Sequence, residues 1–133
     1  MKDSELNGKD KNTIKQILKI RAQKESKLRR KISDVKKQKQ ELKEQRQQTI
    51  RERHNLIEQI RNGSVPSESL GHSELSEFKL QQAKQYQQER ELAEKVVSIQ
   101  QEIHETDNTI EQLNREVLQL VKDQEKLQAV CDE

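Results

Sequence analysis

The stretch from Leu92 to Leu127, LAEKVVSIQQEIHETDNTIEQLNREVLQLVKDQEKL, decides the fold of this 133-residue chain. Nine of its positions follow one another in alternating steps of four and three, and eight of the nine are apolar. They are Leu92, Val96, Ile99, Ile103, Thr106, Ile110, Leu113, Val117 and Leu120. Nearly all residues between them are polar. This is the a/d pattern of a heptad repeat abcdefg, and it predicts a helix with one narrow apolar stripe that packs against a partner helix.

The composition of the whole chain favours long helices over a globular core. Charged residues make up 38% of the chain and hydrophobic residues 29%, and the only aromatic residues are Phe78 and Tyr86. Such a chain can bury no more than a seam between helices. No alternating run of β-branched and aromatic residues predicts a strand. The predicted fold class is therefore all-α.

The first half of the chain carries a second heptad series, which predicts a helix over residues 12–62. Thr13 and Gln16 have the spacing of a capping box, and Gly63 can end the helix in the left-handed conformation. Residues 1–11 read as a disordered lead. The seam positions of this helix are Ile14, Leu18, Arg21, Glu25, Leu28, Ile32, Val35, Lys39, Leu42, Arg46, Thr49, Arg53, Leu56 and Ile60.

The strongest break in the chain lies at residues 63–72, GSVPSESLGH, which hold the only proline and two of the three glycines. Ser73 is placed to cap a second helix over residues 73–130. This helix continues the strong seam at both ends without a change of register. Its further seam positions are Leu75, Phe78, Gln82, Gln85, Glu89, Gln124 and Leu127.

Charge predicts how the two helices pair. Residues 1–62 have a net charge of +10 and residues 63–133 a net charge of −8. A basic and an acidic helix attract each other within one chain, whereas a parallel homodimer would set like charges side by side. We therefore expect residues 12–133 to form one long two-helix antiparallel coiled-coil hairpin. Two registers remain open, one pairing Leu42 with Val96 and the other pairing Val35 with Val96.

The sequence offers little for catalysis. His54, His72 and His104 are far apart, and Asn108 stands where a zinc-protease motif beginning at His104 needs its second histidine. There is no glycine-rich phosphate loop, and two helices form no concave pocket. We expect no enzymatic activity, no catalytic residues, no cofactor, no metal and no small-molecule substrate.

A basic run in the first helix raises the alternative of nucleic-acid binding. Its cations are Lys27, Arg29, Arg30, Lys31, Lys36 and Lys37. Such a helix can contact phosphates in a groove. The run is interrupted by the seam residues Leu28, Ile32 and Val35, and the acidic second helix lies alongside. We therefore do not expect nucleic acid as the main partner.

Two groups of residues are candidates for protein contacts. Arg21 and Glu25 are four residues apart at consecutive seam positions, which suits an intrahelical ion pair or a device that selects the register. Near the break, Leu75, Phe78 and Tyr86 either close the end of the hairpin or offer an exposed docking point. The sequence leaves both interpretations open.

Cysteine usage and hydropathy bear on location. Cys131 is the only cysteine, so no internal disulfide forms, and a reducing compartment is expected. No apolar run reaches the roughly 18 residues that span a bilayer. Residues 1–11 lack the apolar segment of a signal peptide. We expect no direct membrane insertion.

The segment Ile17-Leu18-Lys19-Ile20-Arg21-Ala22-Gln23-Lys24-Glu25 opens a basic heptad helix that turns at mid-chain into a second long helix. In this plan, and in its L-x-x-R-x-x-x-E start at Leu18, Arg21 and Glu25, the chain resembles the FliJ/YscO group. These are small stalk proteins of flagellar and virulence type III secretion systems.

The resemblance implies a non-enzymatic, monomeric stalk. The end that bears both termini would insert into a hexameric secretion ATPase, and the loop side would face an export-gate membrane protein. Chaperones of secreted proteins are further implied partners. The implied location is the bacterial cytoplasm, at the periphery of the inner membrane through the secretion apparatus.

Other functions compete with the stalk. A generic coiled-coil scaffold protein, either monomeric or dimeric, would have the same seam. A prefoldin-like chaperone subunit is also a long hairpin, but it needs a β-hairpin between its helices, and residues 64–72 are too short and polar to supply one. A nucleic-acid binder would show steeply salt-dependent binding.

Overall fold

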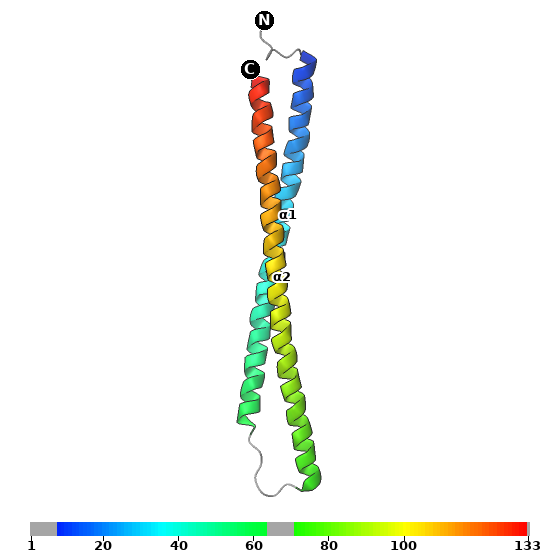
Figure 1. Ribbon diagram of the computed structural model, residues 1–133, viewed down its shortest axis with the longest axis vertical. Helices are drawn as coiled ribbons and strands as arrows, with labels where there is room; N and C mark the ends of the chain where they lie inside the picture. The colour runs from blue at the N-terminus through cyan, green and yellow to red at the C-terminus, as the bar shows by residue number, and fades with distance from the viewer. Residues whose placement is uncertain (1–7, 64–70, 133) are drawn as a thin grey trace. The chain divides into compact units, whose positions relative to one another are not determined.

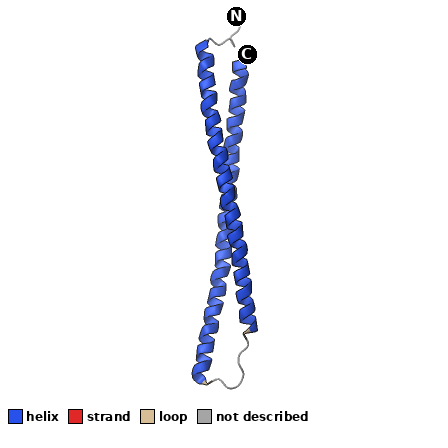
Figure 2. Cartoon of the chain, turned by 180° about the vertical axis from the view of Figure 1, so that it is seen from behind, coloured by secondary structure: helices blue, strands red, loops and turns tan. Residues whose placement is uncertain are grey.

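The computed structural model describes residues 8–63 and 71–132 of the chain. These residues form two helices, α1 (Gly8–Asn62) and α2 (His72–Asp132). Within the described ranges there is no strand, as Figure 2 shows. The all-α prediction is confirmed.

The chain divides into two compact units. The terminal unit comprises residues 1–39 and 106–133, and the loop-side unit comprises residues 40–105. Within each unit a segment of α1 and a segment of α2 lie side by side and run in opposite directions (Figure 1). The predicted antiparallel helical hairpin is therefore confirmed.

The predicted seam is the buried surface of both helices. All thirty seam positions predicted from the heptads, fourteen in α1 and sixteen in α2, are buried or half-buried. Six of them are fully buried: Ile32, Thr49, Ile99, Ile103, Leu113 and Val117. The apolar stripe of each helix is thus covered by the other helix of the same chain.

In the terminal unit the core is built around Ile32, which packs with Leu113 and Val117 of α2. Four half-buried apolar side chains pack against this cluster. They are Leu28, Val35, Ile110 and Val121.

In the loop-side unit the most buried residue is polar. Thr49 is only 2% exposed, and Ile99 and Ile103 are the buried apolar residues of this unit. The Thr49 hydroxyl donates a hydrogen bond of 2.8 Å to the Gln45 carbonyl, one turn earlier. Because its own helix satisfies the hydroxyl, the small β-branched side chain can be buried at low cost.

The register of the hairpin differs from both predicted registers. Four polar contacts between the helices set it, two in each unit, and Val96 then lies level with Thr49 rather than with Leu42 or Val35. The contacts are Glu25 with Gln124, Lys39 with Asp107, Arg46 with Gln100, and Arg53 with Glu89.

The reason for this difference is the polar residues of the α1 seam. With Leu42 opposite Val96, α2 would be shifted by seven residues, so Arg46 would meet Ala93 in place of Gln100 and Lys39 would lose the Asp107 carboxylate. A cation facing an apolar residue at the seam loses hydration without gaining a partner. The observed register gives Lys39 and Arg46 an oxygen acceptor on α2 instead.

The first helix begins earlier than expected. It starts at Gly8, so residues 8–11 of the predicted disordered lead are helical, while residues 1–7 lie outside the described residues. Thr13 is not a cap, because its hydroxyl donates a hydrogen bond of 3.0 Å to the Lys9 carbonyl within the helix. The predicted end at Asn62 is observed. Gly63 donates its N–H to the Gln59 carbonyl at 2.9 Å, but its backbone is not left-handed.

The second helix also extends beyond its predicted bounds, from His72 to Asp132. The Gly71 carbonyl accepts its first backbone hydrogen bond, from the Leu75 N–H at 3.0 Å. Ser73 therefore lies inside the first turn, and the predicted cap at Ser73 is wrong. Most of the predicted loop, residues 64–70, lies outside the described residues.

Substitution of two leucines of α2 compares the contribution to stability of a seam residue with that of a residue on the outer surface. Leu113 is 6% exposed and Leu118 is 55% exposed. We expect Leu113→Ala to lower the free energy of unfolding by about 2–4 kcal/mol, because it leaves a cavity beside Ile32. The control, Leu118→Ala, should change it by less than about 0.5 kcal/mol. Urea unfolding followed by circular dichroism measures both, and equal losses would contradict the burial of this seam.

Paired cysteines test the register. In a Cys131→Ser background, Thr49→Cys with Val96→Cys should form a disulfide readily on mild oxidation, because the two positions lie level on facing helices. The matched control is Leu42→Cys with Val96→Cys, which should cross-link much less. The measurement is the intramolecular disulfide yield on non-reducing gels. Preferential cross-linking of the control pair would instead support the predicted register, in which Leu42 lies opposite Val96.

Candidate interaction surfaces

The three residues that carry the family resemblance lie on the seam of the terminal unit. Leu18, Arg21 and Glu25 are all half-buried on the side of α1 that faces α2. Their first role is therefore in pairing the two helices. Whether they also contact a partner stays a prediction.

Glu25 does not pair with Arg21 as expected. Its carboxylate accepts a 2.7 Å hydrogen bond from the Arg29 guanidinium and a 3.2 Å hydrogen bond from the Gln124 amide of α2. A glutamate one turn before a basic residue has the better orientation relative to the helix dipole than a glutamate one turn after it. Glu25 therefore forms its intrahelical ion pair with Arg29 and not with Arg21.

This environment stabilises the charged form of Glu25. The hydrogen bond from Arg29 is the main cause of a pKa for the Glu25 carboxyl below its ordinary value of 4.5. Partial desolvation opposes the shift, and the hydrogen bond from Gln124 and the positive charge of Arg29 add to it. Glu25 thus couples the pairing of the helices to the ionised state of one carboxylate.

The outer surface of α1 in the terminal unit is strongly basic. The described residues of this unit have a net charge of +7, against −2 for those of the loop-side unit. Nine exposed cations lie within little more than six helical turns. They are Lys15, Lys19, Lys24, Lys27, Arg29, Arg30, Lys31, Lys36 and Lys37. This set, the basic surface, includes every residue of the run that raised nucleic-acid binding.

At the break, the three candidate residues separate into two kinds. Leu75 and Phe78 are half-buried in line with the seam, and Phe78 lines a small recess with Ile60 and Gly63 at the end of α1. Tyr86 is 48% exposed and lies beside the seam rather than in it. The arrangement of Leu75 and Phe78 suits closure of the hairpin, while Tyr86 remains available to a partner.

Tyr86 belongs to a larger apolar group that the sequence analysis missed. Along one edge of the loop-side unit, heptad position e is occupied by Ile50 and Ile57 on α1 and by Tyr86 and Ala93 on α2. The exposed Val97 adjoins Ala93 one turn later. We call these five residues the apolar edge. The sequence pattern that could have revealed this group is two pairs of apolar residues next to the seam. The members of each pair are seven residues apart.

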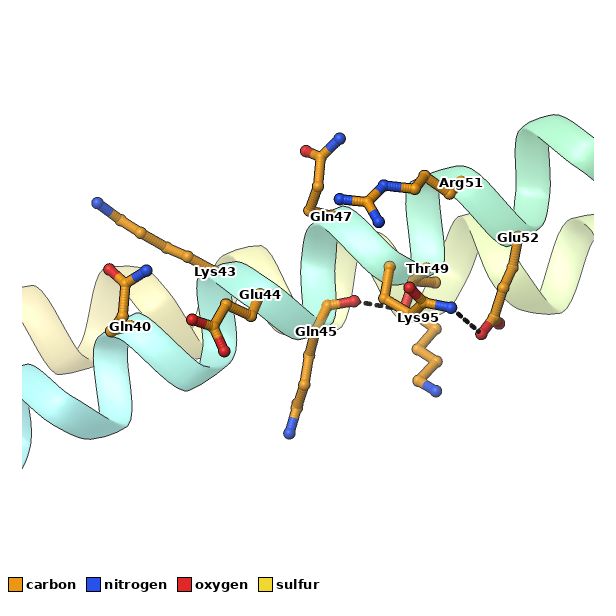
Figure 3. Close-up of a pocket in the computed structure, with 10 residues that line it drawn as sticks. Gln40, Lys43, Glu44, Gln45, Gln47, Thr49, Arg51, Glu52 and Lys95 are labelled. Carbon is orange, nitrogen blue, oxygen red and sulfur yellow. Dashed lines mark hydrogen bonds between the residues drawn. The ribbon is translucent and has the colours of Figure 1, made fainter.

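The opposite edge of the same unit is polar. Its g positions are Gln45, Glu52, Gln59, Gln81, Gln88, Lys95 and Glu102. Figure 3 shows a shallow groove on this side, where Lys95 of α2 lies beside Gln45, Thr49 and Glu52 of α1. The hydrogen bonds drawn there join residues of α1 to one another. The residues that line the groove carry amide, hydroxyl and charged groups.

The described residues hold no group of three or more histidine, cysteine, aspartate or glutamate side chains suited to a metal ion. His54 lies 3.3 Å from Glu58 on the same helix, and His72 and His104 are exposed. Within residues 8–63 and 71–132, neither helix has an apolar stretch long enough to cross a bilayer.

The chain matches no protein-family model, and searches of curated proteins and of solved structures found no significant match. The family resemblance therefore depends on the L-x-x-R-x-x-x-E start and the two-helix plan alone.

The Glu25 contacts predict a pH dependence of stability. Because the pKa of Glu25 is lower in the folded chain than in the unfolded chain, its contribution is complete above about pH 4.5 and is lost as the pH falls below that value. Glu25→Gln should therefore lower the melting temperature at pH 7 and have a smaller effect at pH 3. Thermal unfolding at both pH values, with the wild-type chain as reference, measures this. An effect of equal size at both pH values would contradict the assignment.

Proposed function

We propose that this chain is a non-enzymatic coiled-coil protein that works through contacts of its outer surfaces with other proteins. The seam of each helix is covered within the chain, so what remains for partners is the outer surface. That surface carries two distinct features, the basic surface of the terminal unit and the apolar edge of the loop-side unit. Binding, rather than catalysis, is what these features are suited to.

We further propose that the protein is a central-stalk component of a type III secretion export apparatus. In this proposal the terminal unit inserts as a monomer into a hexameric secretion ATPase, and the loop side faces the export-gate membrane protein. Secretion chaperones are further partners, and the site of action is the cytoplasmic face of a bacterial inner membrane. The two-helix plan and the start at Leu18, Arg21 and Glu25 support it.

The strongest support for this proposal is the positive outer surface of the terminal unit. The basic surface places nine exposed cations on α1 within little more than six helical turns. A helical pair with a positive outer surface suits a ring whose inner lining is acidic, because complementary charge guides insertion and orientation. The described residues of the loop-side unit, at net −2, have no comparable concentration of cations.

The test is an affinity purification of the tagged protein from its native cells, with mass spectrometry of the eluate. We expect a hexameric ATPase with a Walker motif and an export-gate membrane protein. The triple variant Lys24→Glu, Lys27→Glu, Arg30→Glu should recover at least about tenfold less ATPase, because it reverses the charge of the basic surface.

The matched control reverses three exposed cations of the loop-side unit, Lys43, Arg51 and Arg61, and should leave ATPase recovery unchanged. An eluate without any ATPase would overturn the stalk assignment. If the protein itself dominated that eluate, the generic scaffold would take its place, and a mass that rises with concentration in light scattering would identify a dimer.

A further inference from the structure

The apolar edge forms a continuous strip along the loop-side unit. Ile50 and Ile57 are two turns apart on α1, and Tyr86 and Ala93 are two turns apart on α2. In an antiparallel pair, the e positions of both helices lie on the same side of the seam. Ile50, Tyr86 and Val97 are 40%, 48% and 59% exposed. Residues from both helices therefore line one strip, in which Ile57 and Ala93 are half-buried and the other three residues are exposed.

The floor of this strip is polar, and an ion pair lies at its centre. Between the two rows lies the ion pair of Arg53 with Glu89, at 2.8 Å, with 43% and 20% of the two side chains exposed. Arg46 and Gln100 hydrogen-bond on the same side, farther along the strip. A helix that docks over Arg53 and Glu89 buries an ion pair that is already formed, so neither of these two charges is left unpaired.

The strip is not a by-product of a generally apolar surface. The opposite edge of the same unit carries glutamine, glutamate and lysine at every g position from Gln45 to Gln59 and from Gln81 to Glu102. Both edges border the same seam, so helix packing alone does not require one of them to be apolar. Large side chains of Ile and Tyr, placed beside an arginine, have the composition of a protein contact site.

The charges around the strip select the partner. The e and b positions of residues 43–61 and 79–100 hold four exposed cations and no carboxylate, although the loop-side unit as a whole is net negative. The cations are Lys43, Arg61, Lys79 and Arg90. The acidic residues of the unit lie in the seam or on its other surfaces. The strip is thus apolar at its centre and positive at its rim.

We propose that the apolar edge is the docking site for an amphipathic α-helix of another protein, whose apolar stripe is flanked by carboxylates. A helix fits because the rows on α1 and α2 repeat every seven residues, as in a three-helix coiled coil. Carboxylate flanks fit because they pair with the cations of the rim. A second copy of this chain is a poorer occupant, since two-fold packing of strip on strip sets cations against cations. This proposal goes beyond the stalk function and does not depend on it.

The probe is a synthetic helical peptide of about four heptads with leucine at its seam positions and glutamate on both flanks. Fluorescence anisotropy of the labelled peptide measures its affinity for the full chain. We expect the glutamate-flanked peptide to bind at least about tenfold more tightly than a twin with lysine flanks. Equal affinity of the two peptides would overturn the charge assignment.

The variants Ile50→Gln and Tyr86→Gln should each weaken binding of the glutamate-flanked peptide at least about tenfold. Leu80→Gln is the matched control, because Leu80 is 59% exposed on α2 but lies outside the strip, and it should bind as the wild type does. Circular dichroism confirms that each variant remains helical. An effect of Leu80→Gln equal to that of Tyr86→Gln would overturn the site.

Sedimentation equilibrium tests the competing occupant. We expect the wild-type chain and Tyr86→Gln to have the same mass at all concentrations used for peptide binding. A wild-type dimer that Tyr86→Gln dissociates would identify the strip as an interface between copies of this chain and would overturn the proposal. Because neither readout involves an ATPase, failure here is distinguishable from failure of the stalk function.

Discussion

Polar pairing across the seam is the constraint on which the rest of the structure depends. Lys39, Arg46 and Arg53 occupy successive a positions, and each meets an oxygen acceptor on α2. Partly exposed polar pairs of this kind add little to the free energy of folding, typically less than about 1 kcal/mol each. Their effect is on specificity, because a slip of one heptad would put Ala93 in place of Gln100 beside Arg46 and would take Lys39 and Arg53 away from the carboxylates of Asp107 and Glu89. Polar seam residues that select one register at a cost in stability are a known device of coiled coils.

The register decides which outer residues become neighbours. With α1 and α2 paired as observed, Ile57 lies beside Tyr86 and Ile50 beside Ala93, so two short apolar rows join into one strip. A shift by one heptad would place Ile57 beside Lys79 and shorten the strip by half. In the terminal unit, the same kind of pairing buries Ile32 between Leu113 and Val117 and leaves the cations of α1 facing outward. The surfaces proposed for partners are therefore consequences of the seam.

Heptad spacing alone predicted the two helices and every seam position, because burial of a helical stripe needs only a period of 3.5 residues. The helix ends were harder to predict. Thr13 and Ser73 have the spacing of caps, yet Thr13 bonds to a carbonyl of its own helix and Ser73 lies within the first turn. A hydroxyl can either cap the start of a helix or bond to a carbonyl within it, and the neighbouring sequence does not decide between these two roles. Tyr86 was singled out together with Leu75 and Phe78, whereas its apolar neighbours in the apolar edge were missed because half of them are on the other helix.

The sequence by itself determined the class of fold, the two helices, the antiparallel pairing by charge and the residues of the seam, since all of these follow from local periodicity and net charge. Only the tertiary structure decided the register, the partner of Glu25 and the make-up of the apolar edge. A heptad seam looks the same after a shift of seven residues, so the pattern of one helix cannot say which layer of the other it meets. That choice depends on which polar side chains find acceptors once the two helices lie side by side.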